Sequence, residues 1–86
     1  MQTYWIICRS ITFAQRVSHV LYRAGVGHQM LRLPAGLLKS GCGYAVQVRE
    51  ERMAQAMNAL QREGLRPAAL YLESGGQYQE VRYDLS

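Results

Sequence analysis

Arg23-Ala24-Gly25-Val26 returns 39 residues later as Arg62-Glu63-Gly64-Leu65, and this repeat decides the fold that the sequence predicts. Under the same shift, Leu21 falls on Leu60. Each Gly follows apolar residues at helical spacing, and glycine commonly ends a helix because it accepts a left-handed backbone. The two halves of the chain are therefore expected to be copies of one β-α-β unit.

The first unit is predicted to begin with a strand over residues 4–8, which are aromatic, β-branched or small and apolar. Ser10 or Thr12 can cap the helix that follows. Residues 29–33 alternate polar and apolar and end at Pro34, which predicts a second strand. The inward stripe of the helix is expected to be Phe13, Val17, Val20, Leu21 and Ala24.

The second unit is predicted to begin with a strand over residues 44–48, where apolar side chains alternate. A helix follows and ends at Gly64, and residues 68–72 form the fourth strand. Gly75-Gly76 turns the chain, so that residues 78–83 can add a fifth, edge strand. The inward stripe of this helix is expected to be Met53, Ala56, Met57 and Leu60.

Two such units predict an α+β protein of the ferredoxin-like type, a βαββαβ two-layer sandwich. Its antiparallel sheet is expected in the order 4-1-3-2, with both helices on one face and the fifth strand at an edge. The chain of 86 residues is predicted to form a single domain, residues 1–86.

Composition excludes several classes of protein. With 49% hydrophobic and 19% charged residues, the chain is expected to fold. No apolar run reaches the roughly 18 residues of a membrane span, and the first residues lack the pattern of a signal peptide, so a cytoplasmic location is expected. Two cysteines without a CxxC pair, and two separated histidines, predict neither a disulfide scaffold nor a metal site.

The net charge is +4, and nine of the ten basic residues are arginine. Such a balance can steer a protein toward an acidic partner or nucleic acid. Because the arginines are scattered along the sequence, the favoured interpretation is that they lie on solvated faces.

Ser40-Gly41-Cys42-Gly43-Tyr44 is the stretch that most strongly indicates chemistry. Two glycines leave the sulfur of Cys42 uncovered, and the topology places this loop at the same end of the sheet as the start of the first helix. Positive potential at that helix end, with Arg9 and Lys39 near in sequence, favours a thiolate. Cys42 is therefore expected to be an exposed, activated nucleophile.

Cys8 is expected at the same end of the sheet, where two interpretations are open. It can act as a second thiol beside Cys42, or it can pack under the first helix as a small hydrophobe, on the strand face of Tyr4 and Ile6. The sequence favours the packed position. His19 is predicted on a solvated helix face and His28 at the opposite end of the sheet, so no general base is expected near Cys42.

The order of these pieces resembles a family of small selenium/sulfur carrier-like proteins, over about residues 3–72. The chain departs from the family pattern at Cys8, where a bulky apolar residue is more usual, and in residues 73–86, a C-terminal hairpin extension. The features that carry the resemblance are Ser10 to Ala14, Arg23 to Val26, Arg32-Leu33-Pro34, Ser40 to Ala45, Glu63-Gly64-Leu65 and Leu70-Tyr71.

The resemblance implies that Cys42 carries sulfur or selenium transiently, as a persulfide or selenopersulfide, with no other cofactor. It implies a donor such as a cysteine desulfurase-like enzyme, an acceptor protein, and a carrier rather than an autonomous enzyme. Backbone N–H groups of Gly41 and Gly43, with Ser40, are expected to bind the persulfide anion. Ser10 and Thr12, at the helix start, complete the predicted binding set.

Two other classes of function are open to a chain of this topology. The glycine loop partly matches an RNA-recognition signature, but Cys42 replaces its first stacking aromatic and Tyr44 is predicted on the buried face, which disfavours nucleic acid. A non-catalytic interaction or small-ligand module is the second. For it, Trp5, Ile7 and Tyr71 would form an apolar strip on the helix-free face of the sheet. A homodimer through that face, or through the 78–83 edge, is compatible with every function considered.

Overall fold

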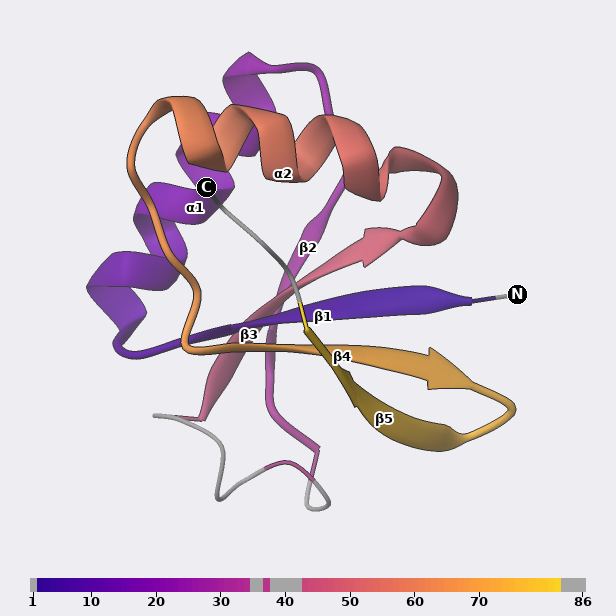
Figure 1. Cartoon of the computed structure of the whole chain (residues 1–86). Coiled ribbons are helices and arrows are strands. Elements are labelled where there is room, and N and C mark those ends of the chain that lie inside the picture. Colours follow the sequence, from indigo (N-terminus) through magenta and orange to yellow (C-terminus); the bar gives the residue numbers. More distant parts are fainter. Residues whose placement is uncertain (1, 35–36, 38–42, 83–86) are drawn as a thin grey trace.

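A computed structural model describes residues 2–34, 37 and 43–82 of the chain. In this part of the chain, two helices lie on one face of an antiparallel five-stranded sheet (Figure 1), which confirms the predicted α+β class. The elements are β1 (Thr3–Cys8), α1 (Ile11–Arg23), β2 (Gln29–Arg32), β3 (Tyr44–Arg49), the 3-10 turn η2 (Glu50–Arg52), α2 (Met53–Arg62), β4 (Ala69–Ser74) and β5 (Gln77–Val81).

The strands are ordered β2-β3-β1-β4-β5 across the sheet, and every neighbouring pair is antiparallel. Counted from β4, the first four strands run β4-β1-β3-β2, and β5 lies outside β4 at the edge. In the register, Cys8 at the end of β1 pairs with Tyr44, and Tyr44 pairs with Arg32 at the end of β2. The ends of β1 and β2 and the start of β3 therefore lie side by side.

The boundaries of all five strands differ from the prediction, by one residue at one end in β1, β2 and β3 and by more in β4 and β5. β4 begins one residue later and continues to Ser74, because Glu73 still pairs with Thr3 on one side and with Tyr78 on the other. β5 spans Gln77–Val81, whereas Tyr83 of the predicted strand lies outside the described residues. The turn η2 before α2 was not predicted.

Both helices end in the same way, which confirms the repeat. Gly25 and Gly64 have left-handed backbones, with φ of 75° and 69°. The N–H of Val26 donates to the carbonyl of Leu21 at 2.9 Å, and the N–H of Leu65 donates to that of Leu60 at 3.0 Å. This six-residue closure satisfies a carbonyl that the helix itself leaves unpaired.

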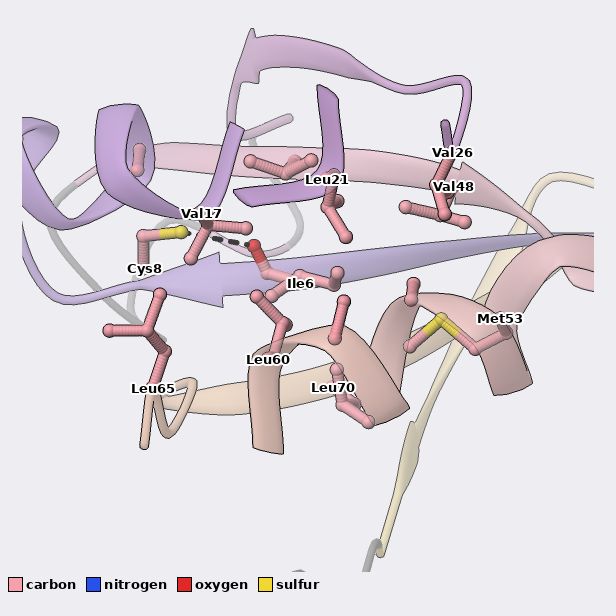
Figure 2. Packing of buried hydrophobic residues seen from close by; sticks show 14 residues of the cluster. Ile6, Cys8, Val17, Leu21, Val26, Val48, Met53, Leu60, Leu65 and Leu70 are labelled. Carbon is pink, nitrogen blue, oxygen red and sulfur yellow. Dashed lines mark hydrogen bonds between the residues drawn. The ribbon is translucent and has the colours of Figure 1, made fainter. Parts of the chain in front are cut away.

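The sheet carries an apolar cluster on each face, because successive side chains of a strand point to opposite sides. Ile6 and Cys8 point to the helices and pack with Val17, Leu60 and other buried residues (Figure 2). Trp5 and Ile7, from the same strand, belong to a second cluster on the other face. That cluster comprises Trp5, Ile7, Leu33, Leu37 and Ala45, with Leu31, Ala69, Tyr71 and Tyr78 packed against it.

Neither of the helices in the described ranges is long and apolar enough to cross a membrane.

Ser10 caps α1: its Oγ accepts a hydrogen bond from the N–H of Phe13 at 3.0 Å. Replacing Ser10 with Ala is expected to lower the free energy of unfolding by about 1 kcal/mol, because that N–H loses its partner. Urea denaturation measures the change. Thr12→Ala, at an exposed position in the first turn, is the matched control and is expected to change stability by less than about 0.5 kcal/mol. Equal losses in the two variants would contradict the capping role.

Candidate functional site

Cys42, Ser40 and Gly41 lie outside the described residues, and so does Lys39. The two ends of their segment are described. Leu33, which follows β2, donates its N–H to the carbonyl of Gly43 at 2.8 Å, so the chain leaves and re-enters the sheet at one place. Gly43 has φ of 101°, a backbone that a side chain would strain, whereas an added Cβ would meet nothing within 4 Å. Glycine is thus required here for its backbone and not for space.

Leu37, inside this segment, is fixed to the sheet. It is 2% exposed and packs in the cluster of Trp5, Ile7 and Ala45 on the helix-free face. Its N–H donates to the carbonyl of Pro34 at 2.9 Å. The segment between β2 and β3 therefore has an apolar anchor as well as a hydrogen bond at its base.

The start of α1 lies at this end of the sheet, as the sequence predicted. Cys8 pairs with Tyr44, which comes two residues after Cys42 in the chain, and α1 begins three residues after Cys8. Ser10 uses its hydroxyl oxygen to cap the helix, and Thr12 is exposed. Their roles in binding, like those of Ser40, Gly41 and Gly43, stay predictions.

Cys8 is 0% exposed and belongs to the core between the sheet and the helices. Its thiol donates to the carbonyl of Ile6 at 3.5 Å, a bond that Figure 2 marks with a dashed line. It shares the strand face of Tyr4 and Ile6, the packed position that the sequence favoured. A donor protein cannot reach this sulfur unless the core opens.

Two arginines at this end of the sheet are held against aromatic rings. The guanidinium of Arg9 lies 5.0 Å from the centroid of Phe13 and donates through Nη2 to the carbonyl of Arg66 at 2.7 Å. Arg32 lies 5.6 Å from the ring of Tyr44. A cation above an aromatic face is attracted by the ring quadrupole, which restrains both side chains near the strand ends.

The histidines lie elsewhere. His19 is exposed on α1. His28, just before β2 and thus at the far end of the sheet, has Nδ1 at 2.8 Å from the carbonyl of Val26 and Nε2 at 2.7 Å from Oγ of Ser18. Since a carbonyl only accepts, Nδ1 is the donor in the contact with Val26. Over residues 2–34, 37 and 43–82, no group of three or more His, Cys, Asp or Glu is placed to hold a metal ion.

Two residues of the expected apolar strip on the helix-free face are buried, and the third, Tyr71, is partly buried. Trp5 is 6% exposed and Ile7 is 0% exposed. Leu33 and Leu37 cover them from one side, and Tyr78 of β5 from the other, with its ring centroid 6.0 Å from that of Trp5 in an edge-to-face contact. The apolar residues lie on the predicted face, but the chain buries them itself.

The same placement bears on RNA binding. Tyr44 packs against the helix-side cluster, as predicted, and Trp5 is sealed on the other face. Recognition of single-stranded RNA by such a sheet requires aromatic rings presented on its open face. Neither ring meets that requirement.

Glu73 and Tyr78 place polar groups at the edge of the apolar cluster on the helix-free face. Glu73 accepts a hydrogen bond from Nε1 of Trp5 at 2.8 Å and pairs across the strands with Tyr78. Burial, and then the negative charge of Glu73, raise the pKa of Tyr78 above its ordinary value of 10.0.

We expect Glu73→Gln to lower the pKa of Tyr78 toward that ordinary value, because the carboxylate charge is removed while the amide oxygen can still accept from Trp5. The titration is followed by the ultraviolet absorbance of tyrosinate, and subtracting the curve of the Tyr78→Phe form isolates this ring. Glu80→Gln, two residues after Tyr78 in β5, is the control and should leave the titration curve unchanged. A pKa that does not fall in Glu73→Gln would show that the carboxylate does not act on the phenol.

Comparison with known proteins gives a match to a family. No match was found to a curated protein or to a solved structure. The family described as "Putative Se/S carrier protein-like" matches residues 3–72, a range that includes the Cys42 segment and ends within β4. Because this match covers most of the 86 residues, the chain belongs to that family.

Proposed function

We propose that this protein carries sulfur or selenium on Cys42, as a persulfide or selenopersulfide, and hands it to an acceptor protein. The family match over residues 3–72 is the observation that carries this proposal, because the family is described as carrier-like for selenium or sulfur. The burial of Cys8 supports the choice of residue, since the chain has two cysteines and this one is sealed in the core.

The transfer needs only one nucleophile. The thiolate of Cys42 attacks the outer sulfur of a donor persulfide, the sulfur–sulfur bond of the donor breaks, and the donor leaves as a thiolate. The new persulfide on Cys42 is then attacked at its outer sulfur by an acceptor thiolate, and Cys42 is released. Both steps conserve the number of electrons, so neither needs an oxidant, a reductant or a metal.

The surroundings of the segment support this chemistry. Gly43 and the Leu33 hydrogen bond fix its base at the end of the sheet where α1 begins, and the N–H groups of a helix start favour an anion. Within the proposal, the backbone N–H groups of Gly41 and Gly43 and the hydroxyl of Ser40 bind the persulfide anion. We also propose a ferredoxin-like topology for the four-strand core, supported by the strand pairing and by both helices lying on one face.

Incubation with a cysteine desulfurase and cysteine is expected to increase the intact mass of the protein by one sulfur atom, and a thiol reductant should reverse the gain. Selenocysteine lyase with selenocysteine provides the parallel arm for selenium. Cys42→Ser is expected to lose the gain entirely, because no other exposed thiol is proposed to accept it. Cys8→Ala is the control that keeps Cys42 and adds no buried polar group.

A gain that survives in Cys42→Ser would overturn the assignment of the residue. No gain in either arm, with the folded protein intact, would count against the carrier function as a whole.

A further inference from the structure

Arginines far apart in the sequence come together along one end of the sheet. Arg9 follows β1, Arg32 ends β2, Arg66 precedes β4 and Arg82 follows β5, and all four are exposed. Strand pairing places them at the same end: Arg32 pairs with Tyr44, which pairs with Cys8. On the other side, Ala68 donates to the carbonyl of Ile7 at 2.9 Å, and Leu70 pairs with Val81.

We call these four residues the arginine row. It crosses the full width of the sheet, from β2 to β5, which at about 4.8 Å per strand is roughly 19 Å. The segment that carries Cys42 leaves and returns between β2 and β3, beside Arg32. The row therefore flanks the base of the Cys42 segment and extends away from it along the strand ends.

Part of the row is held in place. Arg9 and Arg32 each lie over an aromatic ring, and Arg9 also bonds to the carbonyl of Arg66. At the far end, a hollow of about 570 Å³ lies between Arg66 and Arg82, with Glu80 also in its wall. Restrained cations lose little side-chain entropy when a partner binds, which favours them as docking groups.

The opposite end of the sheet has no such excess of charge. There Glu50, Glu51 and Glu73 balance three arginines that are the last residues of α1, β3 and η2, namely Arg23, Arg49 and Arg52. Arg49 lies 3.7 Å from Glu51, and Arg52 bonds to the carbonyl of Gly25 at 2.9 Å. The formal net charge of +4 is thus distributed unevenly, with the positive excess toward the row.

We propose that the arginine row is the docking surface for an acidic face of the protein that donates sulfur or selenium to Cys42 or receives it. This inference rests on the proposed carrier function, because it assigns the partner surface for that transfer. Complementary charge raises the rate of encounter and fixes the orientation of two partners. It would bring an acidic partner to the end of the sheet from which the Cys42 segment extends.

An acidic protein fits this row better than a nucleic acid does. Binding of single strands combines a basic track with aromatic platforms for the bases. Beside the arginine row, the guanidinium groups of Arg9 and Arg32 instead lie over the aromatic rings of Phe13 and Tyr44.

The test uses a fluorescent peptide rich in glutamate, whose anisotropy reports binding to the folded Cys42→Ser protein. Arg66→Glu/Arg82→Glu in that background is expected to weaken binding about tenfold at low salt. Arg16→Glu/Arg23→Glu changes the net charge equally on the exposed face of α1 and is expected to weaken binding less than about twofold. Raising the salt to about 1 M should remove the difference between the variants, because it shortens the screening length to about 3 Å.

Equal losses of peptide affinity in the two double variants would overturn the proposal, since binding would then depend on net charge alone. So would a single-stranded RNA of equal charge that binds more tightly than the peptide and loses affinity only in Arg66→Glu/Arg82→Glu, because the row would then be a nucleic-acid surface. The measurement needs no thiol, so its outcome is independent of the loading of Cys42. If the arginine row binds the peptide but the protein never accepts sulfur, the carrier function is contradicted. The charge-selective binding surface is then still supported.

Discussion

Cys8 will react with iodoacetamide at least about a thousandfold more slowly in the folded protein than in the unfolded chain. The residue is 0% exposed in the core, so its sulfur becomes accessible only when the structure opens. Opening of a core strand costs a large part of the global stability, which for small domains is about 5–15 kcal/mol. An opening cost of about 4 kcal/mol already slows the reaction by a factor of about a thousand.

The measurement is made on Cys42→Ser, so that Cys8 is the one thiol that reacts, with and without denaturant. Intact mass follows the addition over time. A rate within about tenfold of the unfolded rate would contradict the buried position of Cys8. It would also reopen its role as a second thiol in the transfer.

Leu60→Ala is expected to lower the free energy of unfolding by about 2–5 kcal/mol. Leu60 is 0% exposed on α2 and packs in the same cluster as Ile6, Cys8 and Val17 (Figure 2). The truncation removes buried methyl groups and leaves a cavity that the sheet and α1 cannot close fully. For a domain of 86 residues this loss is a large share of the total stability.

Urea denaturation measures the loss. Met30→Ala is the control, because Met30 is 39% exposed on the edge strand β2 and should cost less than about 1 kcal/mol. Combined with Cys42→Ser, Leu60→Ala should also speed alkylation of Cys8 by the factor that corresponds to its loss of stability. A loss below about 1 kcal/mol would mean that the core between α2 and the sheet is not packed as described.

Local patterns were enough to predict most of the elements. Alternation in residues 44–48, the two candidate caps Ser10 and Thr12, of which Ser10 is the cap, and the glycines that end both helices all act within a few residues of chain, so they can be seen in the sequence. The end of β4 could not be predicted, because Glu73 and Ser74 are strand residues by virtue of partners on β1 and β5.

The helix-free face shows where such reasoning stops. The pattern predicts the correct face for Trp5 and Ile7, but their cover comes from Leu37 and Tyr78, at least thirty and more than seventy residues away. Leu37 follows no strand or helix period, so no pattern marked it as a core residue. The arginine row was hidden in the same way, since its members adjoin strand ends that are neighbours only in the sheet.

For the candidate site, the sequence predicted the position of Cys8 in the core and the shared end of β1, β3 and α1. The expected exposure and activation of Cys42 lie outside the described residues. They depend on the path of a segment whose conformation no residue period determines, and therefore stay predictions.

Peptide mapping of the unmodified protein after loading by a cysteine desulfurase and cysteine tests the central claim most directly. Persulfides are first capped by an alkylating reagent, and the protein is then digested without reductant. The account predicts the added sulfur on the peptide that contains Cys42 and none on the peptide that contains Cys8. Sulfur on the Cys8 peptide in the folded protein, or on neither peptide, would contradict it.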